Sequence, residues 1–191
     1  KDSWFWMYPS ENLDTEDYYD QECSWWHTDE RGEVYRNRIR KINGRSYAFD
    51  GIGRMQTGFV LFDGKSEFVA RYEVDDWSSE DFIEGTIYGI EKSDLYLFSP
   101  DELNDGSMQI GKDIAVELED GVFHFGFASN GKAFGNRNRL QKKEGMYYIN
   151  GLRLEADEEY GYGVVKVEDG ADTYYQVVDT RGKVIEGKKK I

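Results

Sequence analysis

The sequence predicts an all-β chain: an irregular array of stacked β-hairpins (a β-solenoid), with an insertion and a non-repeat N-terminal cap. Three observations predict this fold class. Aromatic residues reach 16%, with 21 glycines and 2 prolines, which suits short strands joined by tight turns. Residues 43–59, NGRSYAFDGIGRMQTGF, form a complete hairpin pattern. Finally, the offsets inside that pattern recur along the chain.

The hairpin pattern contains two turns, each with a physical basis. Asn43-Gly44 is a tight-turn dipeptide, because glycine, and less easily asparagine, reaches positive φ. Asp50 and Gly53 bracket the second turn, where an aspartate carboxylate accepts hydrogen bonds from backbone N–H groups. The return strand is expected at residues 54–57, and Gly58-Phe59 closes the unit. One such hairpin is marginal in water, so we expect it to stack on neighbours.

The same unit recurs at a period near twenty residues, which indicates a solenoid or a hairpin array. Met55 and Met108 are each followed by Gln, one further residue and Gly. An aspartate precedes the aligned glycine by three residues at Asp29, Asp50 and Asp179. The aligned glycines are Gly32, Gly53, Gly106, Gly131, Gly151 and Gly182. Tight-turn dipeptides enter other units at Asp120-Gly121, Glu144-Gly145 and Asp169-Gly170.

Residues 43–59 resemble the cell-wall-binding, or choline-binding, repeats of Gram-positive surface proteins, which are related to glucan-binding and clostridial toxin repeats. Further copies are 25–35, 95–111, 120–135, 144–154 and 173–187. The resemblance implies a choline-binding-repeat β-solenoid over residues 25–187. We expect the insertion at about 61–92, a cap at 1–24 and a tail at 188–191.

The resemblance also implies where a ligand would bind. In choline-binding members, a trimethylammonium group sits in an aromatic cage between successive hairpins, with a methionine nearby. Here Phe59, Lys112 and Asn136 follow the closing glycines, where the family carries tryptophan. The candidate groove residues are Trp25, Trp26, Tyr47, Phe49, Met55, Phe59, Tyr96, Phe98 and Met108. Each of these side chains has an alternative place in the hydrophobic core.

Strand alternation and capping signals predict the remaining elements. Tyr47 and Phe49 should point to one face of their strand. A short strand that carries Trp4 and Trp6 should end at Pro9. Asp14 is expected to cap a short helix, and Ser79 another that stops at Gly85. The sequence between them predicts a hairpin around Asp63-Gly64. For the acidic residues 11–22, a polar cap and a Ca²⁺ site are the two interpretations.

Composition excludes several classes of function. The formal charge of −14 argues against nucleic acid and anionic membranes as partners. No apolar run has the length of about 18 residues that membrane insertion needs. The only histidines are His27 and His124, and Cys23 is the single cysteine, so we expect no metal and no disulfide. Because no catalytic motif is present, we expect no catalytic residue, no cofactor and no enzyme.

Three hypotheses for function follow. The first is a non-catalytic, secreted or cell-surface module that attaches to a cell-wall polymer or glycan, including choline on teichoic acid, through aromatic grooves between hairpins. The second is a structural spacer or protein-interaction array with degenerate ligand sites. The third is a small carboxylate-based hydrolase. The start at Lys1 fits a processed or trimmed chain. These interpretations leave the oligomeric state open.

Overall fold

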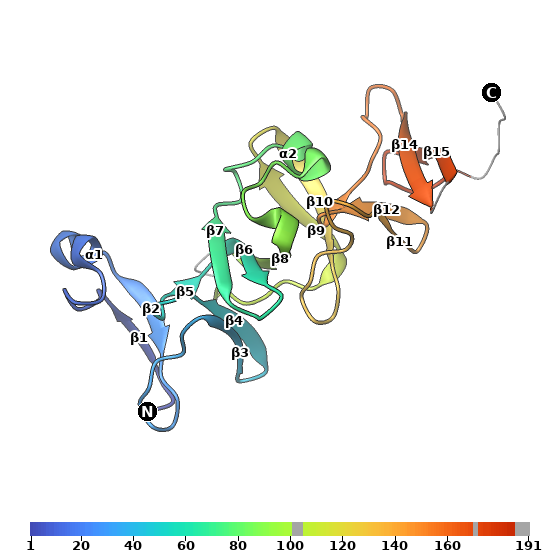
Figure 1. Cartoon of the computed structure of the whole chain (residues 1–191). Coiled ribbons are helices and arrows are strands. Elements are labelled where there is room, and N and C mark those ends of the chain that lie inside the picture. The colour runs from blue at the N-terminus through green and yellow to red at the C-terminus, as the bar shows by residue number, and fades with distance from the viewer. Residues whose placement is uncertain (101–104, 170–171, 186–191) are drawn as a thin grey trace. The chain divides into compact units, whose positions relative to one another are not determined.

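The computed structural model describes residues 1–100, 105–169 and 172–185 of the chain. Almost all of its regular structure is short antiparallel strands (Figure 1), so the predicted all-β class is confirmed. Contacts divide the chain into two compact units. The first contains Lys1–Glu73 and Lys92–Gln109, and the second contains Val74–Glu91 and the described chain from Ile110 onward. The tail predicted at 188–191 lies outside the described residues.

The first unit contains three small sheets, with strand orders β1-β2, β3-β4-β5 and β7-β6-β8. A single turn of 3-10 helix, Ile90–Lys92, leads into its last strand. The elements are β1 (Trp4–Met7), α1 (Thr15–Asp20), β2 (Ser24–His27), β3 (Arg38–Ile42), β4 (Arg45–Phe49), β5 (Met55–Gln56), β6 (Gly58–Asp63), β7 (Phe68–Tyr72) and β8 (Ser93–Phe98).

The hairpin predicted from residues 43–59 is present. Asn43 and Gly44 have φ angles of 48° and 88° and join β3 to β4. At the second turn, Oδ1 of Asp50 accepts hydrogen bonds from the backbone N–H groups of residues 52, 53 and 54 at 3.0, 2.8 and 2.9 Å. The carboxylate thereby satisfies donors that no strand pairs.

This aspartate turn recurs at Asp29 and Asp179, as the offsets predict, and it also occurs at Asp63, which the offsets did not include. In each case Oδ1 of the aspartate accepts two backbone N–H groups, from the residues two and four positions later. These aspartates are Asp29, Asp63 and Asp179. At Asp63 the left-handed position is taken by Ser66, with φ 65°, where Asp29 and Asp179 use a glycine. Backbone hydrogen bonds lower the pKa of the carboxyl groups of Asp29 and Asp63.

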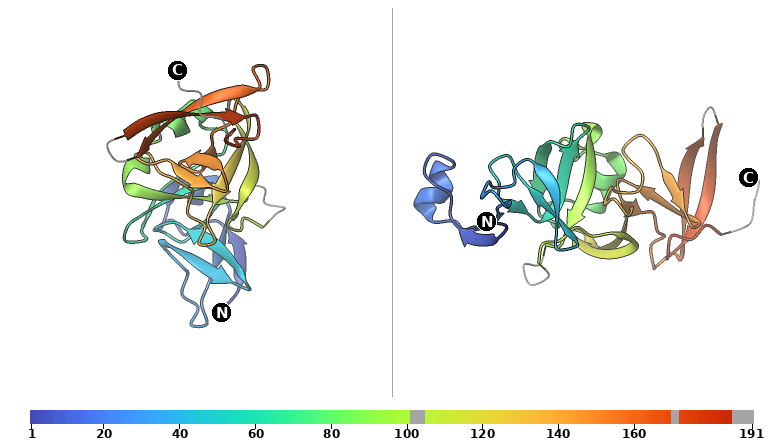
Figure 2. Two further views of the ribbon diagram at one scale, coloured as in Figure 1. Left: turned by 90° about the vertical axis from the view of Figure 1, so that its right-hand side faces the viewer. Right: turned by 90° about the horizontal axis from the view of Figure 1, so that it is seen from below.

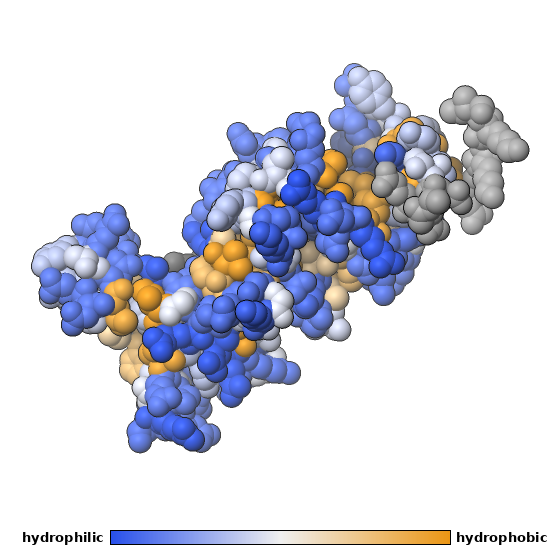
Figure 3. All heavy atoms as spheres, in the orientation of Figure 1, coloured by the Kyte–Doolittle hydropathy of each residue, from blue (hydrophilic) through white to orange (hydrophobic). Residues whose placement is uncertain are grey.

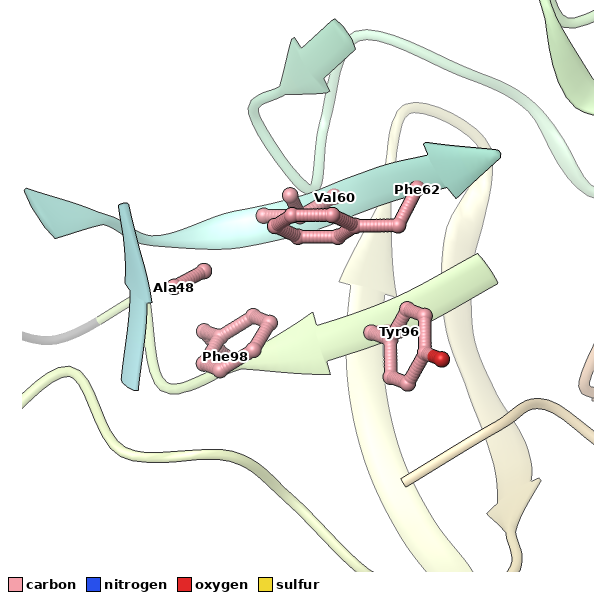
Figure 4. Close-up of a cluster of buried hydrophobic side chains, with 5 residues drawn as sticks. All are labelled: Ala48, Val60, Phe62, Tyr96 and Phe98. Carbon is pink, nitrogen blue, oxygen red and sulfur yellow. The ribbon is translucent and has the colours of Figure 1, made fainter. Parts of the chain in front are cut away.

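Strand alternation builds the core of the first unit on two sides of β4. Tyr47 and Phe49 pack into one cluster with Ile42, which confirms their predicted common face. Ala48, between them, faces the opposite cluster. Figure 4 shows that cluster, in which Ala48 of β4 lies beside side chains of β6 and β8. Its members are Ala48, Val60, Phe62, Tyr96 and Phe98.

The N-terminal elements match the sequence-based predictions. Asp14 caps α1, because its Oδ1 accepts a hydrogen bond of 3.1 Å from the backbone N–H of Asp17. Strand β1 pairs with β2, with Trp4 opposite His27 and Trp6 opposite Trp25. The segment predicted as a cap, 1–24, therefore shares a sheet with the start of the copy predicted at 25–35.

The segment 61–92 contains the predicted hairpin, formed by β6 and β7. Strand β6 also pairs with β8, so the hairpin lies inside a three-stranded sheet. The helix that follows is α2 (Ser79–Glu84), and it ends at Gly85 with φ 67°, as predicted. The predicted cap at Ser79 is wrong by one residue. Ser78 is the N-cap, and its backbone N–H and hydroxyl both donate to Asp81 Oδ2, at 3.0 and 2.7 Å.

The second unit combines α2 with a five-stranded sheet of order β11-β12-β13-β10-β9 and a separate two-stranded ribbon, β14-β15 (Figures 1 and 2). Glu144-Gly145 and Asn150-Gly151 have the same φ signs as Asn43-Gly44 and join neighbouring strands. The elements are β9 (Gly111–Leu118), β10 (Gly121–Phe127), β11 (Gln141–Lys143), β12 (Met146–Ile149), β13 (Leu152–Arg153), β14 (Tyr162–Asp169) and β15 (Asp172–Asp179).

Tyr147 of β12 packs against valines of the β14–β15 ribbon, and these side chains form a core of the second unit. The visible surface is mainly hydrophilic, with small apolar patches (Figure 3). No helix among the described residues is both long enough and apolar enough to cross a bilayer.

Candidate functional site

A pocket of about 270 Å³ lies in the first unit, lined by Trp4, Trp25, Tyr47, Met55 and Asp105. Three aromatic rings and a thioether therefore share one small cavity with one carboxylate. The lining comes from β1, β2, β4 and β5 and from the turn after β8. Pockets for drug-sized ligands have about 300–1,000 Å³, so this one suits a small group.

The register of the β1–β2 ribbon supplies the two indole rings. Trp4 lies opposite His27 and Trp6 opposite Trp25, so all four rings belong to one face of the ribbon. The rings of Trp4 and Trp25 meet edge to face, with centroids 6.3 Å apart. Trp4 also meets the ring of Tyr47 at 4.9 Å. Edge-to-face packing of this kind holds aromatic rings in fixed orientations.

Strands β4 and β5 place Tyr47 and Met55 against these indoles. Met55 pairs with Phe49 across the two strands, and it packs against the cluster that holds Tyr47. Gly106, in the turn after β8, packs closely against the Met55 side chain. A Cβ at Gly106 would lie 2.6 Å from the Met55 Cε atom, and the φ of 64° also favours glycine there.

Asp105 brings a negative charge to the pocket. Its Oδ2 accepts a hydrogen bond of 3.3 Å from the Tyr47 hydroxyl and forms an ion pair with Arg45. Its Oδ1 accepts from the backbone N–H of Ser107 at 3.1 Å. The Asp105 side chain is one-third exposed and that of Arg45 is 65% exposed. The guanidinium of Arg45 thus reaches the carboxylate mainly from the solvent side.

The side chain of His27, which contacts Trp4, is uncharged at neutral pH because it is buried. His27 is 2% exposed and meets the Trp4 ring edge to face at 4.7 Å. It also stacks on the Tyr35 ring, with centroids 5.5 Å apart. Burial lowers the pKa of His27 below its ordinary value, although the nearby charge of Asp2 acts in the opposite direction.

Three of the nine candidate groove residues meet in this pocket: Trp25, Tyr47 and Met55. The other six lie elsewhere. Five of them are buried, and Met108 packs half-buried against the cluster around Ala48. Those five are Trp26, Phe49, Phe59, Tyr96 and Phe98. Phe59, which holds the place of the family's cage tryptophan, is 1% exposed and belongs to the packed interior.

Sequence reasoning missed two lining residues, Trp4 and Asp105. Trp4 precedes the repeats, and only the alternation of Trp4 and Trp6 hinted at a shared face. Asp105 belongs to the repeat copy at 95–111, where it lies in the turn after the first strand, just before the aligned Gly106. Its approach to Tyr47 is a contact between residues 58 positions apart, which local patterns do not encode.

A second polar cluster surrounds His124 in the second unit. His124 Nδ1 lies 3.2 Å from a Glu155 oxygen and its Nε2 lies 3.9 Å from Asp113. The buried Arg153 pairs with both acids. Among residues 1–100, 105–169 and 172–185, no group of three His, Cys, Asp or Glu side chains is arranged to hold a metal ion.

The first unit therefore combines short antiparallel sheets with a pocket lined by aromatic rings, a thioether and a carboxylate. No family model and no curated protein matches the sequence. Among solved structures, the chain is similar to CbpJ from Streptococcus pneumoniae, with 14% identity and a TM-score of 0.47 over 97% of this chain and 60% of that one. It is also similar to the pneumococcal cell wall endolysin from phage Cp-1 complexed with choline, with 16% identity and a TM-score of 0.39 over 98% and 38%.

A third similar structure is choline binding protein F from Streptococcus pneumoniae, with 15% identity and a TM-score of 0.27 over 95% of this chain and 47% of that one. The chain therefore spans between 38% and 60% of the length of these three structures. All three likenesses are distant.

Proposed function

We propose that the chain is a non-catalytic, surface-located module that attaches to cell-wall polymer by holding a quaternary ammonium group, such as the choline of a teichoic acid, in the Trp4–Trp25–Tyr47–Met55 pocket. One observation carries this proposal: three aromatic rings, a thioether and a carboxylate line one small cavity. Ring faces attract a cation through their quadrupole, and the carboxylate adds an attractive charge.

The pocket chemistry favours a cation over the other ligands considered. A neutral sugar gains stacking from the rings but nothing from the charge of Asp105. An anion is repelled by Asp105 and by the overall charge of −14. An alkylated ammonium has a positive charge within an apolar shell of alkyl groups. It can therefore pack against the indole rings and be attracted by the carboxylate at the same time. The resemblance of residues 43–59 to choline-binding repeats supports the same ligand.

The test is a titration of intrinsic tryptophan fluorescence with choline, run on the unaltered chain and on two matched variants. Trp25→Ala removes a pocket wall that is 36% exposed, whereas Phe5→Ala removes a ring that is 40% exposed on the opposite face of β1. A cation–π contact is worth roughly 0.5–2 kcal/mol, so Trp25→Ala should weaken choline binding by about 2- to 30-fold.

Phe5→Ala should leave the affinity unchanged. Retention of the unaltered chain on choline-bearing cell walls, with release by free choline, would place the binding at the wall. A chain that folds but shows no response to choline would overturn the proposal.

A further inference from the structure

A second pocket, of about 610 Å³, lies within the second unit and shares no residue with the aromatic pocket. Its walls come from α2, the loop at 137–140, the segment 154–157 and strand β14. The volume falls within the range of about 300–1,000 Å³ that is usual for ligand pockets. Nothing in the proposed function uses this cavity.

Two arginines give the second pocket a positive edge. Arg137 and Arg139 both line it, and both are exposed. Within the described part of the chain, neither guanidinium forms an ion pair. The stem of Arg137 lies over Gly85, where a Cβ would come within 2.5 Å of the Arg137 Cγ atom. The backbone turn at the end of α2 therefore makes room for this side chain.

The two carboxylates in the lining, Glu155 and Asp157, have partners other than Arg137 and Arg139. Glu155 is already paired with Arg153 and lies 3.2 Å from His124. Asp157 Oδ1 accepts a hydrogen bond of 2.7 Å from the backbone N–H of Glu159. In a chain of net charge −14, two guanidinium groups that pair with no acid among the described residues attract an anion to this cavity.

Two tyrosines give the pocket an aromatic wall. Tyr160 and Tyr162 line the cavity and are 74% and 66% exposed. A hydrogen-bonded turn carries Tyr160, because the Gly161 N–H donates to the Asp157 carbonyl oxygen at 2.9 Å. Tyr162 begins β14. Rings that are anchored but remain in water offer flat apolar faces, which suit the C–H face of a sugar ring.

We propose that this pocket binds an acidic saccharide, whose sugar ring stacks on Tyr160 or Tyr162 and whose carboxylate or phosphate pairs with Arg137 and Arg139. The planar guanidinium fork matches both anions in geometry. The ligand class differs from that of the aromatic pocket in the sign of its charge, because Asp105 there selects a cation and the arginines here select an anion. The module would then contact a wall polymer through two chemistries.

The test is isothermal titration calorimetry with three disaccharides that differ in one group: cellobiose, cellobiouronic acid and cellobiose 6′-phosphate. We expect binding of the acidic probes at millimolar concentration or below, weakened by added salt, and little binding of cellobiose. Tighter binding of cellobiouronic acid would identify a carboxylate ligand, and tighter binding of the phosphate probe a phosphate ligand. Either result supports the site.

Three variants locate the binding. Arg139→Gln should weaken binding of the better acidic probe by about tenfold, since it removes a charge-assisted contact. Tyr160→Ala should weaken binding of all probes that bind. Arg181→Gln removes one exposed positive charge of the second unit outside the pocket, and it should have no effect. Equal affinity for cellobiose and the acidic probes, no binding of any probe, or equal loss in Arg139→Gln and Arg181→Gln would overturn the proposal.

Discussion

The Tyr47 hydroxyl donates a hydrogen bond of 3.3 Å to Asp105 Oδ2, across 58 residues of sequence. This contact connects a ring of strand β4 to the carboxylate that lines the aromatic pocket in the described part of the chain. Asp105 also pairs with Arg45. A cationic ligand and the guanidinium of Arg45 therefore compete for the same carboxylate. Substitutions at Asp105 and at Arg45 test this competition separately.

Asp105→Asn should weaken choline binding about fivefold or more, because a unit charge near the surface contributes roughly 1 kcal/mol or more. Asparagine keeps an oxygen that can accept from Tyr47. Arg45→Gln should have the opposite effect and strengthen binding, since it removes the competing cation. Both affinities are measured by fluorescence titration at low ionic strength. A loss of affinity in Arg45→Gln would contradict the role given to this pair.

Gly58→Ala should destabilise the fold by about 1–3 kcal/mol, the cost typical of a strained backbone. Gly58 has φ 77°, and an added Cβ would lie 2.4 Å from the carbonyl oxygen of Tyr72. Gly51→Ala is the matched control, because Gly51 has no atom within 4 Å of its Cβ position and no positive φ. Urea unfolding of both variants gives the comparison. Equal losses would show that the close approach to β7 is unimportant.

Asp50→Ala should cost about 2 kcal/mol or more, because three backbone N–H groups and the Arg54 guanidinium lose their acceptor. Arg54 Nε donates to Asp50 Oδ2 at 2.8 Å, and Arg54 also reaches Asp14 and Asp17 near α1. Asp29→Ala removes a similar turn carboxylate that is less buried than Asp50, and it should cost less. Thermal unfolding at pH 7 ranks the two. The reverse order would contradict the link between this turn and the N-terminal helix.

Stability should fall as the pH decreases below about 6.5, the ordinary pKa of histidine. Burial lowers the folded-state pKa of His27, so the unfolded chain takes up a proton before the folded chain does, and acid favours unfolding. The loss should continue until the pH reaches the folded pKa. His27→Phe should flatten this dependence, whereas His124→Gln should not. The measurement is the free energy of unfolding of the unaltered chain and both variants between pH 7.5 and pH 5. The same pH dependence in all three proteins would rule out His27 as the cause.

Much of this fold was predictable from local sequence. The turns at Asn43-Gly44 and at Asp50 could be predicted from their residue types alone, because few residues reach positive φ and few side chains cap a turn. The common face of Tyr47 and Phe49 follows from strand alternation. The pairing of β6 with β8 was not predictable in this way, since the thirty or so residues between Asp63 and Ser93 carry no signal for that pairing.

The candidate pocket was only partly predictable for the same reason. Trp25, Tyr47 and Met55 belong to repeat copies, and a repeat pattern marks its aromatic positions. The same pattern also marked Phe59, which packs in the core, because sequence periodicity does not separate a buried ring from a ring that lines a cavity. Trp4 comes from outside the repeats, and Asp105 comes from a turn whose place is set by tertiary contacts.

The most direct measurement compares the affinity of the chain for choline and for 3,3-dimethyl-1-butanol, which has the same shape without the positive charge. The pocket of three rings and Asp105 should bind choline at least about tenfold more tightly, because only choline gains cation–π and carboxylate attraction. Trp25→Ala should reduce that difference. Equal binding of the two compounds, or no binding of either, would contradict the account of this pocket as a cation cage.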